Sequence, residues 1–256
     1  MSQNLHGDAD FLHLTALFAR VTALWCPYLL IWGEIMSQHD ARRRYMVESQ
    51  LRTNKVTNTR VLEAFEALPR ESFVATELES LAYIDEDLDL GNGRFMLEPM
   101  VFARMVQALE LKETDSVLDI GAANGYCTAI ISHLAQSVVG IEKDADLAVA
   151  GQNNLTAHDV DNAVILEGEL AHGFEDEAPY NAIIIEGGVE RVPQALLEQL
   201  NDDGRLIAIL RPDPAGPGRV VKYVRSGKGF AYTVLFDANT PVLDDFIEDR
   251  GFSFGD

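Results

Sequence analysis

The sequence predicts an α/β domain around a parallel sheet, and three observations from the middle of the chain predict it. Residues 116–120 form a short apolar run, which is typical of a strand buried on both faces of a sheet. A turn of small residues follows at 121–125, and helical spacing of apolar residues comes next at 128–135. A second apolar run at 138–141 then ends in an acidic residue. This order of strand, turn, helix and strand predicts a Rossmann-like unit.

The other elements follow from apolar patterns of the same kind. Residues 40–90 carry apolar side chains at three- and four-residue steps, which predicts helices. Pro99 suits the first turn of a further helix that extends to Leu111. Gly227 and Gly229 favour a hairpin between the last two strands. The additional strands are expected at 163–166, 180–185, 204–210, 219–224 and 230–236, with a helix at 192–200.

The small-residue turn and the acidic residue after it have the chemistry of a nucleoside site. Gly121 has no Cβ, so a ligand can approach the backbone closely there. Glu142 lies 21 positions later, at the end of the next strand, where a carboxylate can accept hydrogen bonds from both hydroxyls of a ribose. The turn matches neither G-x-G-x-x-G nor G-x-x-x-x-G-K-[ST], so the sequence predicts neither a dinucleotide site nor a nucleotide phosphate site.

Composition excludes several classes of function. The chain has 256 residues, of which 47% are hydrophobic, and its net charge of −21 opposes binding to a phosphate backbone. The one basic triplet, residues 42–44, is expected to be a solvated helix face, so no nucleic-acid partner is predicted. Cys26 and Cys127 have neither metal-ligand nor redox spacing. We therefore expect no metal, a core role for Cys127 and a reducing, cytoplasmic location.

The chain divides into three parts, which are residues 1–35, 36–111 and 112–256. The first is an extension with an apolar stretch that His13, Arg20 and Pro27 interrupt. Three interpretations of it stay open, because it could be upstream sequence, an amphipathic helix that packs on the domain or a partner, or, least in keeping with its charges, a membrane element. Residues 36–111 are the helical region, and residues 112–256 form the sheet domain.

Residues along most of the chain resemble the protein-L-isoaspartate O-methyltransferase family. The resemblance extends over about residues 46–236, and its motifs occur in the family's order and at fitting intervals. It implies a class I methyltransferase fold with a seven-stranded sheet, an N-terminal helical cap over the substrate at 36–111 and S-adenosylmethionine bound by 112–256. The segments that carry it are 46–51, 61–62, 69–74, 82–83, 117–121, 125–129, 178–183, 192–193, 197–200 and 204–206.

The same resemblance suggests roles for individual residues. Gly121 would let the methionine part of the cofactor approach, Asp119 would orient its amino group, and Glu142 would bind the ribose. Gly168 and Glu169 would border the adenine. The full set of expected cofactor-binding residues is Asp119, Gly121, Asn124, Gly125, Glu142, Gly168 and Glu169.

This chain departs from the family pattern at the acceptor site. The family's segment G-x-G-Q-T-I-S-Q-P reads G-N-G-R-F-M-L-E-P at 91–99, so Leu97 replaces the active-site serine and Phe95 the threonine. A leucine cannot form the serine's hydrogen bond, so we expect isoaspartyl methylation to be weak. Arg94 is expected near the acceptor, where it would pair with a carboxylate. Glu186 replaces a small residue at the end of a central strand, and facing the crevice it would disfavour an anionic acceptor.

Methyl transfer from a sulfonium to a carboxylate needs no general base, because the acceptor is already ionised at pH 7. The absence of a Ser, Cys or His catalytic arrangement is therefore compatible with activity. The sequence predicts an S-adenosylmethionine-dependent methyltransferase whose first-choice acceptor is a protein or peptide carboxylate. Two alternatives stay open, a small-molecule acceptor and a non-catalytic scaffold that binds the cofactor. Arg94, Leu97 and Glu186 are the candidate acceptor-site residues, and the oligomeric state is left open.

Overall fold

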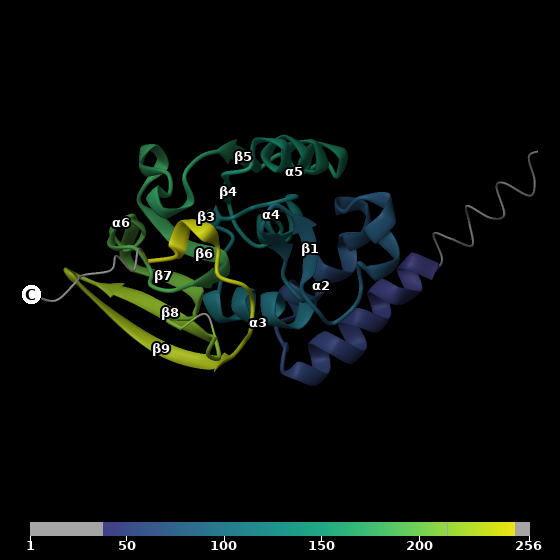
Figure 1. Cartoon of the computed structure of the whole chain (residues 1–256), viewed down its shortest axis with the longest axis horizontal. Coiled ribbons are helices and arrows are strands. Elements are labelled where there is room, and N and C mark those ends of the chain that lie inside the picture. Colours follow the sequence, from purple (N-terminus) through teal and green to yellow (C-terminus); the bar gives the residue numbers. More distant parts are fainter. Residues whose placement is uncertain (1–37, 214, 249–256) are drawn as a thin grey trace, which may run out of the picture. The chain divides into compact units, whose positions relative to one another are not determined.

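A computed structural model describes residues 38–213 and 215–248, and its main feature is one seven-stranded sheet (Figure 1). The strand order is β5-β4-β3-β6-β7-β8-β9. Strands β3 to β7 run parallel, whereas β8 is antiparallel to β7 and β9 is antiparallel to β8. The bounds are β3 Ser116–Ile120, β4 Ser137–Glu142, β5 Ala163–Glu167, β6 Tyr180–Val189, β7 Leu200–Leu210, β8 Arg219–Ser226 and β9 Gly229–Asp237.

The central strands are buried on both faces because their residues are apolar without alternation. Successive side chains of β3 point to opposite faces, so Val117 packs into one hydrophobic cluster and Leu118 into another. Ile184 and Ile183 of β6 divide between the same two clusters. The two layers of side chains enclose the sheet and fix its carboxyl edge, where β3 and β4 end side by side.

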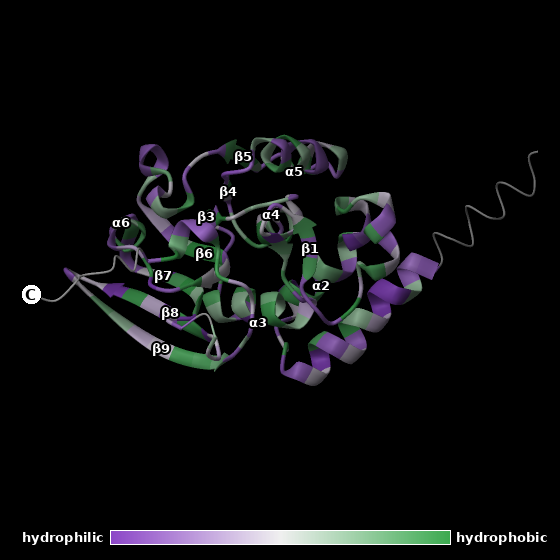
Figure 2. Cartoon of the chain, viewed as in Figure 1, coloured by the Kyte–Doolittle hydropathy of each residue, from purple (hydrophilic) through white to green (hydrophobic). Residues whose placement is uncertain are grey.

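Helices α2 to α5 contribute to the first cluster, and the N-terminal helical cap belongs to the same core as the sheet. Phe65 of the cap and Val117 of the sheet are members of this one cluster. The described residues from Arg43 onward form one compact unit. Figure 2 shows mostly hydrophobic residues along α3, which packs on β7. The bounds are α2 Thr59–Ala67, α3 Pro99–Leu109, α4 Tyr126–Ser132 and α5 Ala145–Ala157.

The second cluster is covered by short elements instead of long helices. They are α6 (Gln194–Glu198), the 3-10 turn Leu170–His172 and the C-terminal segment 238–248, whose Leu243 and Phe246 are buried. Most of the remaining short elements precede α3. They are the π-helical turn Val47–Leu51, the 3-10 turns Arg52–Asn54, Arg70–Phe73 and Thr76–Leu81, and the hairpin of β1 Leu88–Gly91 and β2 Arg94–Met96. Two further 3-10 turns come later in the chain, at Glu175–Glu177 and Asp244–Phe246.

The sequence predictions for the fold are confirmed, with differences at element ends. The seven-stranded sheet, the proline at the start of α3 and the hairpin of β8 and β9 are as expected. The expected helix at 192–200 shortens to five residues, because the chain already enters β7 at Leu200. The loop around Gly91 and Gly93 is a hairpin turn, since both glycines adopt positive φ. Residues 1–35 lie outside the described residues.

Candidate functional site

The small-residue turn lies between the end of β3 and the start of α4. Gly121 has φ +86° and Gly125 has φ +83°, a conformation that favours glycine. A Cβ on Gly125 would lie 2.9 Å from the carbonyl oxygen of Gly151 on α5, so the turn and that helix touch backbone to backbone. Asn124 is buried, and its carbonyl accepts a hydrogen bond from Asn154 at 2.9 Å. The turn is thus held rigidly against α5.

Glu142 ends β4 beside this turn, and its carboxylate is completely buried. Oε2 accepts hydrogen bonds from the Ala123 N–H at 2.8 Å and from Arg94 Nη2 at 2.7 Å and Nε at 3.2 Å. Oε1 accepts from the backbone N–H groups of Lys143 at 2.7 Å and Asp144 at 2.9 Å. Three backbone donors and the Arg94 guanidinium therefore hold the carboxylate in one position beside the turn.

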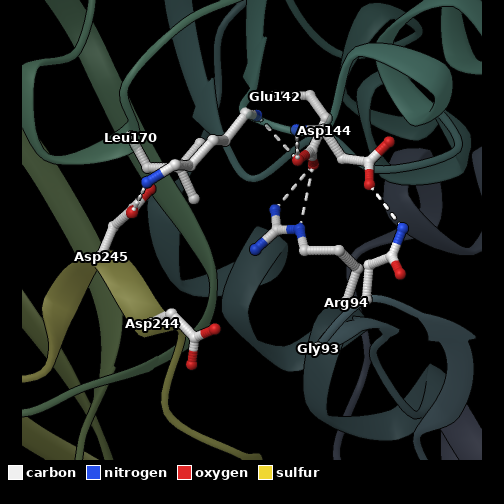
Figure 3. Close-up of a pocket in the computed structure, with 9 residues that line it drawn as sticks. Gly93, Arg94, Glu142, Asp144, Leu170, Asp244 and Asp245 are labelled. Carbon is white, nitrogen blue, oxygen red and sulfur yellow. Dashed lines mark hydrogen bonds and ion pairs between the residues drawn. The ribbon is translucent and has the colours of Figure 1, made fainter.

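A cavity of about 320 Å³ opens in front of Glu142 (Figure 3). Arg94 and Asp144 flank it on one side and Asp245 lies on the other, while Asp244 points into the space between them. Lys143 pairs with Glu169 at 3.2 Å and also with Asp245. The wall has more carboxylates than cations, which suits a positively charged ligand. The lining residues are Asn92, Gly93, Arg94, Glu142, Lys143, Asp144, Leu170, Asp244 and Asp245.

Asp119 and Glu186 form a buried acid pair next to this site. Pairing of β6 with β7 is irregular between Ile184 and Gly188, and such a bulge re-aims the side chains it contains. Asp119 Oδ2 accepts from the Thr128 hydroxyl at 2.6 Å, whereas Asp119 Oδ1 and Glu186 Oε1 lack any other donor. The two side chains interact directly, so a proton on one carboxyl would give the other a hydrogen-bond donor.

Burial raises the pKa of both acids. The pKa of Asp119 rises to about 6, chiefly through desolvation, and that of Glu186 rises well above its usual value through desolvation and the neighbouring charge of Asp119. Cys127 is buried beside Glu186, and burial raises the pKa of its thiol, so it stays protonated and packs in the core as expected.

The structure brings most of the expected cofactor residues together at this edge of the sheet. Gly168 donates its N–H to the carbonyl of Glu142 at 2.9 Å, which places the end of β5 next to the end of β4. Glu169 is largely exposed and reaches the cavity only through its ion pair with Lys143. Lys143, Asp144 and Leu170 also line the cavity, although the sequence did not single them out. The sequence could have indicated them by position alone, because Lys143 and Asp144 directly follow Glu142 and Leu170 lies two residues after Gly168.

The three candidate acceptor-site residues lie in different surroundings. Arg94 pairs with Glu142 at the expected ribose position. Leu97 is completely buried in the same cluster as Phe65, and Arg70 fixes its carbonyl through Nη2 at 2.7 Å. Glu186 has only 3% of its surface exposed and turns toward Asp119, so the structure does not place it facing the crevice.

The C-terminal segment 238–248 crosses the carboxyl edge of the sheet, which the sequence did not predict. Gly188 donates its N–H to the Pro241 carbonyl at 2.9 Å, and the Leu243 N–H donates to the Gly188 carbonyl at 2.9 Å. Leu243 fills the space over Gly187, where an added Cβ would lie 2.5 Å from its Cγ. Its Cδ1 also lies 3.7 Å from the Cβ position of Gly121, so Leu243 separates the two glycines.

Comparison with known proteins identifies the family of this chain. The sequence profile of protein-L-isoaspartate(D-aspartate) O-methyltransferases matches residues 41–230. The chain belongs to this family. It is 37% identical over 175 residues to a protein-L-isoaspartate O-methyltransferase of Methanoculleus marisnigri, covering 68% of this chain and 77% of the relative. It is 38% identical over 181 residues to a second such enzyme of Anaeromyxobacter, covering 71% and 72%.

Solved structures agree on the fold. A protein-L-isoaspartate O-methyltransferase superposes with a TM-score of 0.71 at 20% identity, covering 78% of this chain and 65% of that one. A Plasmodium falciparum protein described as a beta-aspartate methyltransferase in complex with S-adenosyl-L-homocysteine gives a TM-score of 0.66 at 18% identity, with coverages of 81% and 98%. The predicted family, enzyme class and S-adenosylmethionine dependence of that family are confirmed.

Membrane-spanning helices and metal sites can be sought only among the residues that the structure describes. Within residues 38–213 and 215–248, no helix is long and apolar enough to cross a membrane. In the same part of the chain, no group of three or more His, Cys, Asp or Glu side chains is arranged to hold a metal ion. The apolar stretch at 11–32, for which a membrane element was the least favoured interpretation, lies outside the described residues.

Proposed function

We propose that this protein transfers the methyl group of S-adenosylmethionine to a carboxylate of a protein or peptide. The observation that carries the proposal is the buried Glu142, whose carboxylate lines the cavity beside the positive-φ glycine Gly121. A carboxylate at the end of the second core strand, next to a turn with no side chain at its glycine, suits a ribose and the chain of atoms beyond it. The residues present therefore fit a sulfonium nucleoside.

Each residue of the site has a defined task in this scheme. Glu142 accepts hydrogen bonds from the ribose, Gly121 gives room to the methionine part, and Leu170 supplies an apolar wall beside Gly168. The acidic cavity wall favours a cationic donor over its neutral product. The donor brings a methyl group that is already activated by positive sulfur, so the chain has to align the acceptor and exclude water. Leu243 and Phe246, both buried, provide apolar cover at this edge.

The state of Glu186 removes an objection to a carboxylate acceptor. A charged carboxylate at the crevice would repel an anionic substrate. Here Glu186 is buried and turned toward Asp119, and desolvation raises its pKa well above the usual value, so burial favours its uncharged form. The repulsion that the sequence predicts between Glu186 and an anionic acceptor is therefore weakened, because the buried side chain does not face the crevice. This supports a protein or peptide carboxylate as the acceptor. The proposal includes a cytoplasmic location, because the two cysteines have neither metal-ligand nor redox spacing in the sequence.

The test is transfer of labelled methyl from S-adenosylmethionine to an isoaspartyl peptide and to a mixture of unmodified acidic peptides. A methyl ester releases its label as methanol in mild base, whereas an N-methyl product does not. We expect base-labile label, and the relative rates on the isoaspartyl and the unmodified acidic peptides show which carboxylate is the acceptor. Base-stable label would contradict a carboxylate acceptor and favour a different one.

Calorimetry on Glu142→Ala tests the cofactor half of the proposal. Loss of the charge-assisted hydrogen bonds to the ribose should weaken S-adenosylmethionine binding by about 1.5–3 kcal/mol per bond. Glu66→Ala, on the exposed face of α2, removes the same charge from a surface position and should leave the affinity unchanged. Equal affinity of Glu142→Ala and the unmodified protein would remove Glu142 from the site. Binding without transfer to any acceptor would favour the scaffold alternative.

A further inference from the structure

Arg94 occupies the place where the ribose is expected. Its guanidinium donates through Nε and Nη2 to Oε2 of Glu142, an oxygen that also accepts the Ala123 N–H. Backbone N–H groups take the other oxygen. A carboxylate offers about four lone-pair positions, so five donors leave no free position for two ribose hydroxyls. Arg94 Nη2 also lies 2.8 Å from the Cβ position of Gly121, at the surface the methionine part must approach.

We propose that Arg94 is a latch on the cofactor site, and that the methyl donor binds only to molecules whose guanidinium has left Glu142. The inference rests on the proposed function, since it concerns the same donor. In its observed position Arg94 blocks the donor in two ways. It occupies the Glu142 oxygens that the ribose hydroxyls need, and it fills the space over Gly121 that the methionine part needs. The donor is also a cation, so the Arg94 charge beside Gly121 opposes its approach electrostatically.

The surroundings of Arg94 make its release feasible. The pair is almost dry, with 9% of the Arg94 side chain and none of the Glu142 side chain exposed, so a lone charge left there would be costly. Glu142 nevertheless keeps three backbone N–H donors after the arginine leaves. Arg94 lines the open cavity together with Asp144 and Asp244, so its charge has carboxylates to move toward (Figure 3).

The neighbouring backbone permits this movement. Arg94 begins the short strand β2, directly after the positive-φ residues Asn92 and Gly93. Around Gly93, an added Cβ would meet only Asp244 Oδ2, at 3.8 Å, so the turn has space around it. The other end of the segment is fixed, because Arg70 holds the Leu97 carbonyl at 2.7 Å. Arg94 therefore follows a turn with free space around it and precedes a residue whose backbone is fixed. This placement allows its side chain to adopt a second position while β2 stays in place.

The latch predicts that removing the arginine tightens cofactor binding. Arg94→Gln installs the glutamine of the family segment, keeps a hydrogen-bonding group and removes the charge. Because the apparent dissociation constant is the intrinsic one divided by the open fraction, a latch that is open about 10% of the time gives about tenfold tighter binding in the variant. Calorimetry should be run with S-adenosylmethionine and with S-adenosylhomocysteine, whose neutral sulfur separates the contribution of charge. Arg219→Gln is the matched surface control, because Arg219 also pairs with a carboxylate but 59% of its side chain is exposed, and the affinity of this variant should stay unchanged.

Association kinetics of the unmodified protein give a second measurement that needs no variant. If Arg94 must leave first, the observed rate by stopped-flow fluorescence should level off at high ligand concentration, whereas the Arg94→Gln rate should keep rising linearly. Equal affinities, or weaker binding by a stably folded Arg94→Gln protein, would overturn the latch. If that variant does not fold, a rate in the unmodified protein that rises linearly without limit overturns it as well. Failure of both proteins to bind either ligand would instead overturn the proposed function, and the inference with it.

Discussion

The family pattern and the structure assign different roles to Leu97, one at the acceptor site and one in the hydrophobic core. The substitution Leu97→Ser distinguishes between these two roles. The family pattern places this residue at the acceptor, where a serine would restore a hydrogen bond and raise isoaspartyl turnover. The structure buries the whole side chain in the core, in one cluster with Phe65 and Phe102. Serine would then leave a cavity and an added hydroxyl without a partner in apolar surroundings.

The cost of Leu97→Ser can be worked out from its burial. Removing a fully buried leucine loses about 1.5–3 kcal/mol of transfer free energy, and the buried hydroxyl adds about 1–3 kcal/mol. A total of about 4 kcal/mol corresponds to a drop in melting temperature of roughly 8–16 °C for a domain of this size. Leu81→Ser is the control, since Leu81 is 42% exposed, and it should cost no more than about 1 kcal/mol.

Thermal unfolding followed by circular dichroism, in parallel with the labelled-methyl assay, measures both consequences of Leu97→Ser. We expect a large loss of stability without a gain of isoaspartyl activity. An unchanged melting temperature together with faster isoaspartyl turnover would refute the core assignment and return position 97 to the acceptor site.

Three further predictions follow from the packing, the titrating acids and the domain limits. Gly151→Ala places a Cβ 2.8 Å from the Ala123 carbonyl oxygen, so it should lower the free energy of unfolding by about 1–3 kcal/mol and weaken cofactor binding. The control is Asn153→Ala at an exposed position of the same helix, which should change neither the melting temperature nor the affinity measured by calorimetry. Burial and the nearby Asp87 raise the pKa of Glu98 to about 7, so the folded state favours the protonated carboxyl, and folding stability falls as pH rises from about 4.5 through 7. The melting temperature should therefore fall over that range, and it should fall less in Glu98→Gln. An equal pH slope of the melting temperature in Glu98→Gln and in the surface control Glu66→Gln would contradict this. A chain that starts at Met36 should remain soluble and bind the cofactor with unchanged affinity, because the family match begins at residue 41, and aggregation of this shorter chain would show that residues 1–35 cover an apolar surface.

The sequence by itself determined the sheet domain and the position of the site along the chain. Apolar runs such as 116–120 and 180–185 can be buried only between two layers, and a parallel arrangement brings their carboxyl ends to one edge. Gly121 and Glu142 were predictable for the same reason, since a turn after one strand and an acid after the next must lie next to each other there. These are local signals, fixed by spacing and residue type.

Only the tertiary structure decided which partners those residues have. Arg94 lies 48 positions before Glu142, and Leu243 lies 122 positions after Gly121, so no periodic pattern links either pair. The buried contact of Asp119 with Glu186 likewise depends on two strands meeting in a particular register, with a bulge that turns Glu186 toward its neighbour. Burial and the positions of distant charges set the protonation and occupancy of this site, and both quantities exist only once the chain has folded.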